Sequence, residues 1–246
     1  MERTLDRGST PLISTSWKIK FTKYQHINMN LYFNGVEKEE EMKIVYGTSN
    51  KEKIAQVEEY LAFRNINIEF LSLKDIGFDE EIEENGTTFE ENSMIKAKAI
   101  QAFCKKNDIE YPILTDDAGL CVDALNGEPG VYSARYAGDH APQIVAINKV
   151  LEKMKNVPDE KRTAKFVCVL TLVMPNGEVK VVRGETHGRI VKTPGPLGKL
   201  TYNPIFIPDG FDRTMTELTA EEIGTTHREK ALNELLKVLQ EENYLD

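Results

Sequence analysis

The sequence contains few cysteines, and none of them lie close together. Cys104, Cys121 and Cys168 are the three cysteines among 246 residues, and no two of them form a CxxC pair. This spacing argues against a zinc site. It also fits a protein that works in a reducing compartment, so we expect a cytoplasmic location.

Long apolar runs and an excess of positive charge are also missing. No stretch approaches the length of a transmembrane helix, and the N-terminus lacks the apolar segment of a secretory signal. The chain has 31 Lys and Arg against 40 Asp and Glu, a formal net charge of -9. This balance disfavours non-specific nucleic-acid binding but allows a phosphate site, since a few local cations and a metal suffice. We therefore expect neither a nucleic acid nor a membrane as partner.

Residues 1–41 differ from the rest of the chain. They show weak periodicity, contain the only tryptophan, and end in a Lys-Glu-rich run directly before Met42. We expect Met42 to be the natural start, because a purine-rich ribosome-binding sequence read in frame would encode such a run. A disordered arm or a targeting peptide is the alternative. Either way, residues 42–246 are expected to form the folded domain.

From Met42 onward, strand-like and helix-like segments alternate. Short apolar runs predict strands at 43–46, 66–73 and 112–114, and the runs 164–174 and 178–191 flank a Pro-Asn-Gly turn that predicts a hairpin. Between and after them, apolar residues recur at helical spacing. Thr88 and Glu91 form a capping box that predicts a helix start. The alternation predicts a single α/β domain, and the hairpin makes its sheet mixed.

The most polar of these boundaries is the stretch 115–138. Asp116 and Asp117 follow the short run 111–114 directly, and two turn dipeptides come after them. The pattern predicts a strand that ends in two carboxylates. Carboxylates there are well placed to hold Mg²⁺, which prefers oxygen ligands and phosphate. On spacing alone, a surface turn with solvated aspartates explains the pattern equally well.

Three further polar clusters lie next to expected element ends. The segment 48–53 begins a helix whose backbone N–H groups could attract phosphate, although its glycine spacing is not that of a Walker loop. The acidic loop 83–92, with Lys96 beyond it, could supply a second metal ligand. Arg228 at 225–228 offers a planar fork for phosphate or a base carbonyl. Each cluster alone also fits an ordinary capped helix or solvated loop, but together they suggest a site for an anionic ligand carrying Mg²⁺.

The motifs themselves point to a family. The segments TSNKEK, ENGTTFEENSMIKAKA, DDAGLCVDALNGEPGVYSARYAG and THREKAL closely resemble the inosine/xanthosine triphosphate pyrophosphatase family, in the family's order. These enzymes hydrolyse nonstandard purine nucleoside triphosphates to the monophosphate and pyrophosphate. The resemblance implies an elongated α/β domain with a long mixed sheet flanked by helices and an active-site cleft between two lobes. It also implies Mg²⁺ and a homodimer.

The resemblance assigns roles to individual residues. Asp117 matches the proton acceptor and metal ligand, Glu84 matches the metal-binding glutamate, and Asp116 is a further candidate ligand. We expect these three carboxylates to lie close together and to repel one another without a cation. The remaining candidates are assigned to the substrate: the phosphate loop Thr48, Ser49, Asn50, Lys51, Glu52 and Lys53, the motif lysine Lys96, the base-contacting pair His227 and Arg228, and Ala118, Leu200, Thr201, Tyr202 and Asn203.

The sequence departs from the family pattern mainly where the base is recognised. Leu200 replaces a stacking phenylalanine, Asn203 an aspartate, and Ala118 a serine, while Ile223 replaces a lysine ahead of the His-Arg pair. The metal and phosphate motifs are intact. We therefore expect weaker discrimination of inosine from adenosine triphosphate than in typical members. Turnover of another modified nucleotide, or nucleotide binding without turnover, are the alternatives.

Overall fold

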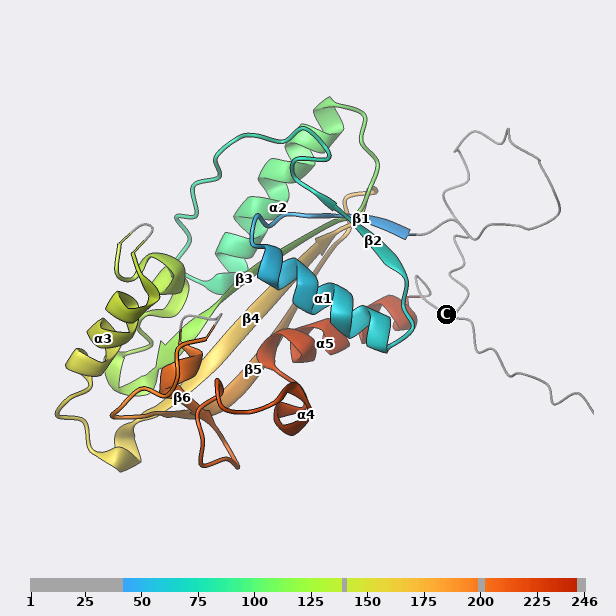
Figure 1. Ribbon diagram of the computed structural model, residues 1–246. Helices are drawn as coiled ribbons and strands as arrows, with labels where there is room; N and C mark the ends of the chain where they lie inside the picture. The colour runs from blue at the N-terminus through green and yellow to red at the C-terminus, as the bar shows by residue number, and fades with distance from the viewer. Residues whose placement is uncertain (1–41, 139–140, 199–201, 243–246) are drawn as a thin grey trace, which may run out of the picture.

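The computed structural model describes residues 42–138, 141–198 and 202–242 (Figure 1). The expectations for residues 1–41 and for Leu200 and Thr201 fall outside these ranges. No helix in the described part is long and apolar enough to cross a bilayer. The three cysteines are free thiols.

A six-stranded mixed sheet in the order β2-β1-β3-β4-β5-β6 forms the centre of the molecule. β1 is parallel to both β2 and β3, and the remaining neighbours are antiparallel. The β4–β5 pairing confirms the predicted hairpin. The strands are β1 (Met42–Tyr46), β2 (Ile68–Ser72), β3 (Ile113–Val122), β4 (Thr163–Val173), β5 (Val179–Ile190) and β6 (Phe206–Pro208).

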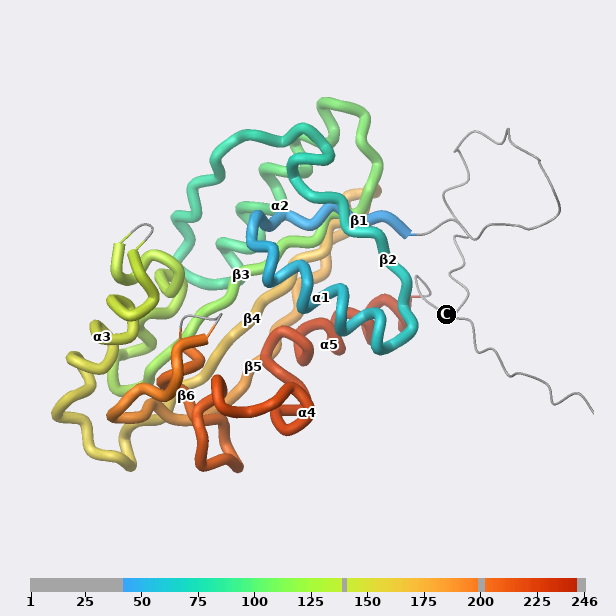
Figure 2. Tube along the Cα trace, viewed as in Figure 1, coloured from blue at the N-terminus to red at the C-terminus, as the bar shows by residue number. Residues whose placement is uncertain are grey.

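Helices cover both faces of this sheet (Figure 1). α5 packs on β4 and β5 and contacts α1, whereas α2 packs on the other face of β3 and β4. Figure 2 shows the connection from β2 to α2 running along the α2 side. The helices are α1 (Lys51–Phe63), α2 (Phe89–Lys106), α3 (Gln143–Lys153), α4 (Ala220–Ile223) and α5 (His227–Glu241), with short 3-10 turns η1 (Asp123–Leu125), η2 (Gly130–Arg135), η3 (Asp159–Lys161) and η4 (Asn203–Ile205).

The hydrophobic core of the α1–α5 face forms two clusters along the sheet. The first lies under α1 and α5 and includes Leu114 and Leu170. The second lies under α3 and includes Leu120 and Phe166. In α3 the buried residues begin after its first turn, and Ile144 in that turn is exposed. The two clusters give the sheet a core at each end, with a polar region where they meet.

The helix starts follow local sequence signals. The capping box of Thr88 and Glu91 is present as predicted and begins α2. Thr226 and Glu229 form another capping box, which fixes the first turn of α5. These caps satisfy backbone N–H groups that the first turn of a helix would otherwise leave unpaired. They fix the residue at which each helix begins.

β3 is longer than predicted, and this corrects the expectation of a strand that stops before the acids. Asp116 and Asp117 lie inside the strand and pair with Leu170 and Val169 of β4. The ladder with β4 supplies the backbone hydrogen bonds that keep this polar stretch extended. The two carboxylates therefore belong to a strand and not to a turn.

Candidate active site at the carboxyl end of β1

The candidate site lies where β1 stops beside β3. The Gly47 N–H donates to the carbonyl oxygen of Leu114 at 2.8 Å, so β1 covers only the beginning of β3. β2 and β3 flank β1 on opposite sides. In open α/β sheets, ligands bind outside the carboxyl ends of strands at such a point. The loop after β1 and the acidic part of β3 therefore meet at a typical binding position.

Asp116 points toward α1 and α5 and is held by two cations. Lys53 Nζ lies 2.8 Å and Arg228 Nη1 2.7 Å from its Oδ2 atom. Tyr46 donates a hydrogen bond to Oδ1 at 3.3 Å. Burial by itself raises the pKa of Asp116, but Lys53 and Arg228 outweigh it and hold the pKa well below its usual range. Asp116, only 1% exposed, is thus an ionised anchor for two helices.

Asp117 points toward the opposite face, because successive strand residues alternate. Its Oδ2 atom accepts a hydrogen bond from Asn92 Nδ2 at 3.2 Å, and its Oδ1 atom accepts from the Ala118 N–H at 2.9 Å. Burial raises the pKa of Asp117, and Lys96 and Asn92 only partly offset this effect. The carboxylate is therefore fixed in orientation but lacks full compensation of its charge.

Glu84 reaches the same neighbourhood from the loop that precedes α2. Lys96 Nζ donates to its Oε2 atom at 2.7 Å, and Arg135 Nη2 donates to its backbone carbonyl at 2.8 Å. The charge of Glu84 contributes to the raised pKa of Asp117. Two carboxylates and one ammonium group therefore share this side of the site.

The expected cluster of three carboxylates is not present. Asp116 and Asp117 point to opposite faces of β3, and Asp116 is already neutralised by Lys53 and Arg228. Among the residues that the structure describes, no group of three Asp, Glu, His or Cys side chains could hold a metal. Glu84 and Asp117 remain as a pair of oxygen donors. Their under-compensated charge fits a hard divalent cation such as Mg²⁺.

The loop between β1 and α1 is organised by Asn50. Its Oδ1 atom accepts the N–H groups of Glu52 at 3.0 Å and Lys53 at 3.4 Å, so Asn50 is the N-cap of α1. Thr48 Oγ1 accepts the Asn50 N–H at 3.2 Å. Ser49 and the first two residues of α1 are exposed. A phosphate that used the Glu52 and Lys53 amides would have to displace Asn50, whereas Lys53 Nζ already faces the site.

His227 begins α5 and stacks on Phe166 of β4. The ring centroids are 5.1 Å apart at 16°. Nδ1 of His227 is buried and has no hydrogen-bond partner. Burial, followed by the charges of Arg228 and Lys53, lowers the pKa of His227 to about 3. A neutral imidazole with one unsatisfied nitrogen therefore lies where the two core clusters meet.

The residues of the expected base loop do not all join this group. Tyr202 is buried in the second core cluster, and its hydroxyl donates to the Ser133 carbonyl at 2.9 Å. Asn203 begins η4 and is partly exposed, and Ile223 packs against the same cluster. The structure thus places Tyr202 in the core, where its hydroxyl is already used.

Sequence reasoning missed several residues that shape the site. Asn92 contacts Asp117, Arg135 holds the Glu84 backbone, and Gln56 accepts from Arg228 Nε at 3.2 Å. A signal existed for Asn92, because it lies four residues before Lys96 and therefore on the same side of α2. No comparable signal connects Arg135 with Glu84, which are 51 positions apart.

Comparisons with known proteins identify relatives of this chain. A model of the Ham1 family matches residues 44–238. The dITP/XTP pyrophosphatase of Leuconostoc mesenteroides is 45% identical over 199 residues, which cover 80% of this chain and 96% of that protein. That of Bacillus subtilis is 42% identical over 197 residues, with 80% and 96% covered.

Two solved structures of Ham1 proteins are similar to this chain in sequence and in fold. The Staphylococcus aureus Ham1 protein is 35% identical and superimposes with a TM-score of 0.70, covering 81% of this chain and 99% of that one. A Ham1 protein from Coxiella burnetii is 36% identical, also with a TM-score of 0.70. The resemblance predicted from the motifs is confirmed. With a family model matching most of its length and relatives above 40% identity, the chain belongs to the Ham1 family.

Proposed function

We propose that this protein hydrolyses nonstandard purine nucleoside triphosphates, dITP and XTP among them, to the monophosphate and pyrophosphate. The observation that carries the proposal is the oriented, buried Asp117 beside the Glu84–Lys96 pair at the carboxyl end of β1. The names of the relatives as dITP/XTP pyrophosphatases support the substrate class. The test is release of pyrophosphate from a panel of nucleoside triphosphates.

Mg²⁺ is the cofactor that we propose for this site. Glu84 and Asp117 would hold it, because their oxygen donors and partly uncompensated charge suit a hard cation. When bound, Mg²⁺ would neutralise phosphate charge in the reaction. Removal of Mg²⁺ with EDTA is expected to abolish pyrophosphate release, and full activity in EDTA would contradict this part of the proposal.

We assign a separate role in the reaction to each group of side chains. Asp117 accepts the proton of the attacking water on a carboxylate oxygen, in the orientation that Asn92 and the Ala118 N–H give it. Lys53, Lys96 and the loop 48–53 bind the phosphates. His227 Nδ1, which is buried without a partner, is available to hydrogen-bond the base. Arg228 also contacts the base, and its ion pair with Asp116 holds it in position.

Base discrimination is proposed to be weaker than in typical family members. Leu200, Asn203, Ala118 and Ile223 replace residues of the family pattern, and the structure places Ile223 against the core. Adenosine triphosphate is therefore expected to be hydrolysed at a measurable fraction of the inosine triphosphate rate. Strong selectivity for inosine triphosphate would contradict this. Tight binding of inosine triphosphate without pyrophosphate release would favour a binding protein, and preference for a modified pyrimidine would favour a different substrate.

Three further parts of the proposal concern the whole protein. We assign the activity to residues 42–246, supported by the family match at 44–238. A chain that starts at Met42 is expected to keep the kcat of the full chain.

We also propose a cytoplasmic location, supported by the free thiols, and a homodimer, supported by the family resemblance. Light scattering on the purified protein tests the dimer, and a monomeric mass would contradict it.

A further inference from the structure

Asn92 connects the two candidate metal ligands, although the family resemblance assigns it no role. It lies in the first turn of α2 and is 0% exposed. Its Nδ2 atom donates to Asp117 Oδ2 at 3.2 Å, and its Oδ1 atom accepts from the Gly86 N–H at 2.8 Å. Gly86 is two residues after Glu84. One buried amide thus bridges the strand that carries Asp117 and the loop that carries Glu84.

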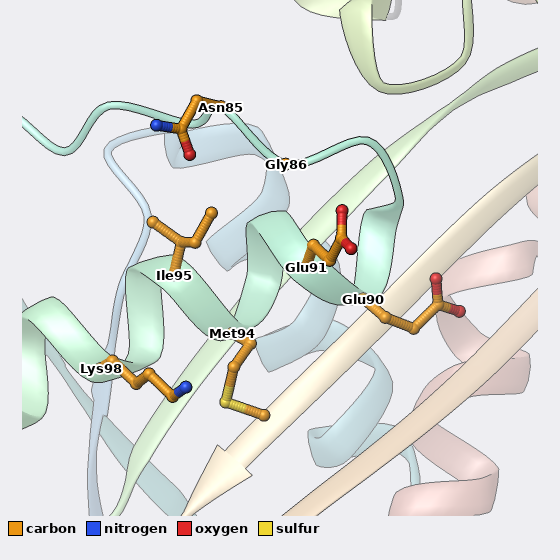
Figure 3. A pocket seen from close by; sticks show the side chains of 7 residues that line it. All are labelled: Asn85, Gly86, Glu90, Glu91, Met94, Ile95 and Lys98. Carbon is orange, nitrogen blue, oxygen red and sulfur yellow. The ribbon is translucent and has the colours of Figure 1, made fainter.

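The outer flank of the loop is open. Asn85 and Gly86 pass beside α2 and line a surface hollow of ≈ 520 Å³, together with residues of that helix (Figure 3). Neither Glu84 nor Asp117 lines this hollow. On the inner flank, Gly86 lies so close to α2 that a Cβ atom there would be 2.7 Å from Asn92 Oδ1. The Asn92 amide therefore holds the Gly86 part of the loop against α2, while Arg135 holds the carbonyl oxygen of Glu84.

The same amide also sets the orientation of the Asp117 carboxylate. One carboxylate oxygen is held by Asn92 and the other by the Ala118 backbone N–H. The Gly86 N–H must face the Asn92 oxygen, so the nitrogen is the atom that faces Asp117. Groups that orient a metal ligand through a hydrogen bond typically affect metal affinity or activity 10–100-fold when removed.

We propose that Asn92 is a positioning residue that sets Glu84 and Asp117 at a fixed separation and orientation, so that they bind a divalent cation together. The inference rests on the proposed function, because it assigns a role at that same site. Asn92 touches neither substrate nor metal in this account. It acts through its hydrogen bonds to Asp117 and to the loop.

The test compares the full-length wild type with Asn92→Leu, which removes both hydrogen bonds at similar volume, and Gly86→Ala, which disturbs the bridge from the loop side. The matched control is Ser93→Ala. Ser93 is equally buried and adjacent in α2, but it bonds to Thr115 and not to Asp117. Asn92→Ser replaces the leucine variant if that one does not fold.

Two readouts are measured: calorimetric binding of Mn²⁺ to the substrate-free protein, and kcat and KM for XTP. We expect Asn92→Leu and Gly86→Ala to weaken Mn²⁺ binding and lower kcat by about 10–100-fold, while Ser93→Ala loses only thermal stability. Wild-type values in both bridge variants, or equal losses in the control, would overturn the inference. A wild type that hydrolyses neither dITP nor XTP would instead overturn the proposed function.

Discussion

The ammonium group of Lys53 lies 2.8 Å from the carboxylate of Asp116, an ion pair that ties the start of α1 to the middle of β3. Arg228 of α5 contacts the same oxygen at 2.7 Å. The two residues proposed to bind phosphate and base are thus fixed by one buried anion. Asp116 acts as the anchor of the cationic half of the site, separate from the metal half.

Replacing Asp116 by asparagine should therefore destabilise the protein. Arg228, 5% exposed, would be left buried without its counter-charge, and breaking a buried pair in this way costs about 3–5 kcal/mol. Chemical denaturation measures the loss. Tyr46→Phe is the control, since it removes only the 3.3 Å hydrogen bond and should cost about 1 kcal/mol. An Asp116→Asn variant as stable as the wild type would contradict the anchor role.

His227 should make stability depend on pH in mildly acidic solution. Its pKa is lowered to about 3 in the folded protein, first by burial and then by Arg228 and Lys53. The unfolded chain binds a proton near its ordinary value of about 6.5, so stability is complete above that pH and falls as the pH drops toward 3. Between pH 7 and 5 the wild type should lose about 1–2 kcal/mol more than His227→Gln. Identical pH profiles in denaturant titrations would show that His227 is not buried as a neutral group.

The close approach of α5 to β5 requires Gly184. A Cβ atom at this position would lie 2.1 Å from the carbonyl oxygen of His227 and 2.4 Å from the nitrogen of Ala231. Both neighbours are backbone atoms, so Gly184→Ala must push the start of α5 away from the sheet. We expect a loss of about 1–3 kcal/mol in stability and a higher KM for XTP, measured by thermal unfolding and steady-state kinetics.

Gly188→Ala is the control that separates a general packing defect from displacement of α5. A Cβ atom at Gly188 would lie 2.2 Å from the carbonyl oxygen of Ile207, so Gly188→Ala creates a similar clash at β6 instead of α5. Its stability should fall by a similar amount, with a smaller rise in KM. If both variants raise KM equally, displacement of α5 is not the cause.

The local features of this fold could be predicted because their signals are short in sequence. The hairpin after Val173 and the capping box at Thr88 depend on residues within a few positions of each other, and both are present. The length of β3 could not be predicted, because its polar stretch is kept extended by β4, some fifty residues away. Strand alternation would have separated Asp116 from Asp117 once that length was known.

The sequence predicts which residues belong to the site, but not which of them contact one another. The motifs identified Lys53, Asp116 and Arg228 as candidates, yet Arg228 is 112 positions from Asp116, and no local pattern indicates their ion pair. Tyr202 of the expected base loop is buried in the second core cluster, where its hydroxyl donates to the carbonyl oxygen of Ser133, 69 positions away. Long-range charge pairing thus decides which acid is an anchor and which is free to react.

Asp117→Asn is the measurement that tests the central claim most directly. Burial raises the pKa of Asp117, so its charge is costly in the folded state, and asparagine removes that cost. Its amide nitrogen would, however, face one of the two donors, Asn92 Nδ2 or the Ala118 N–H, so thermal stability should change little. With Mg²⁺ and dITP or XTP, kcat for pyrophosphate release should nevertheless fall by about 10²–10⁴-fold, since the proton acceptor is lost. A folded Asp117→Asn protein that releases pyrophosphate at the wild-type rate would contradict the account.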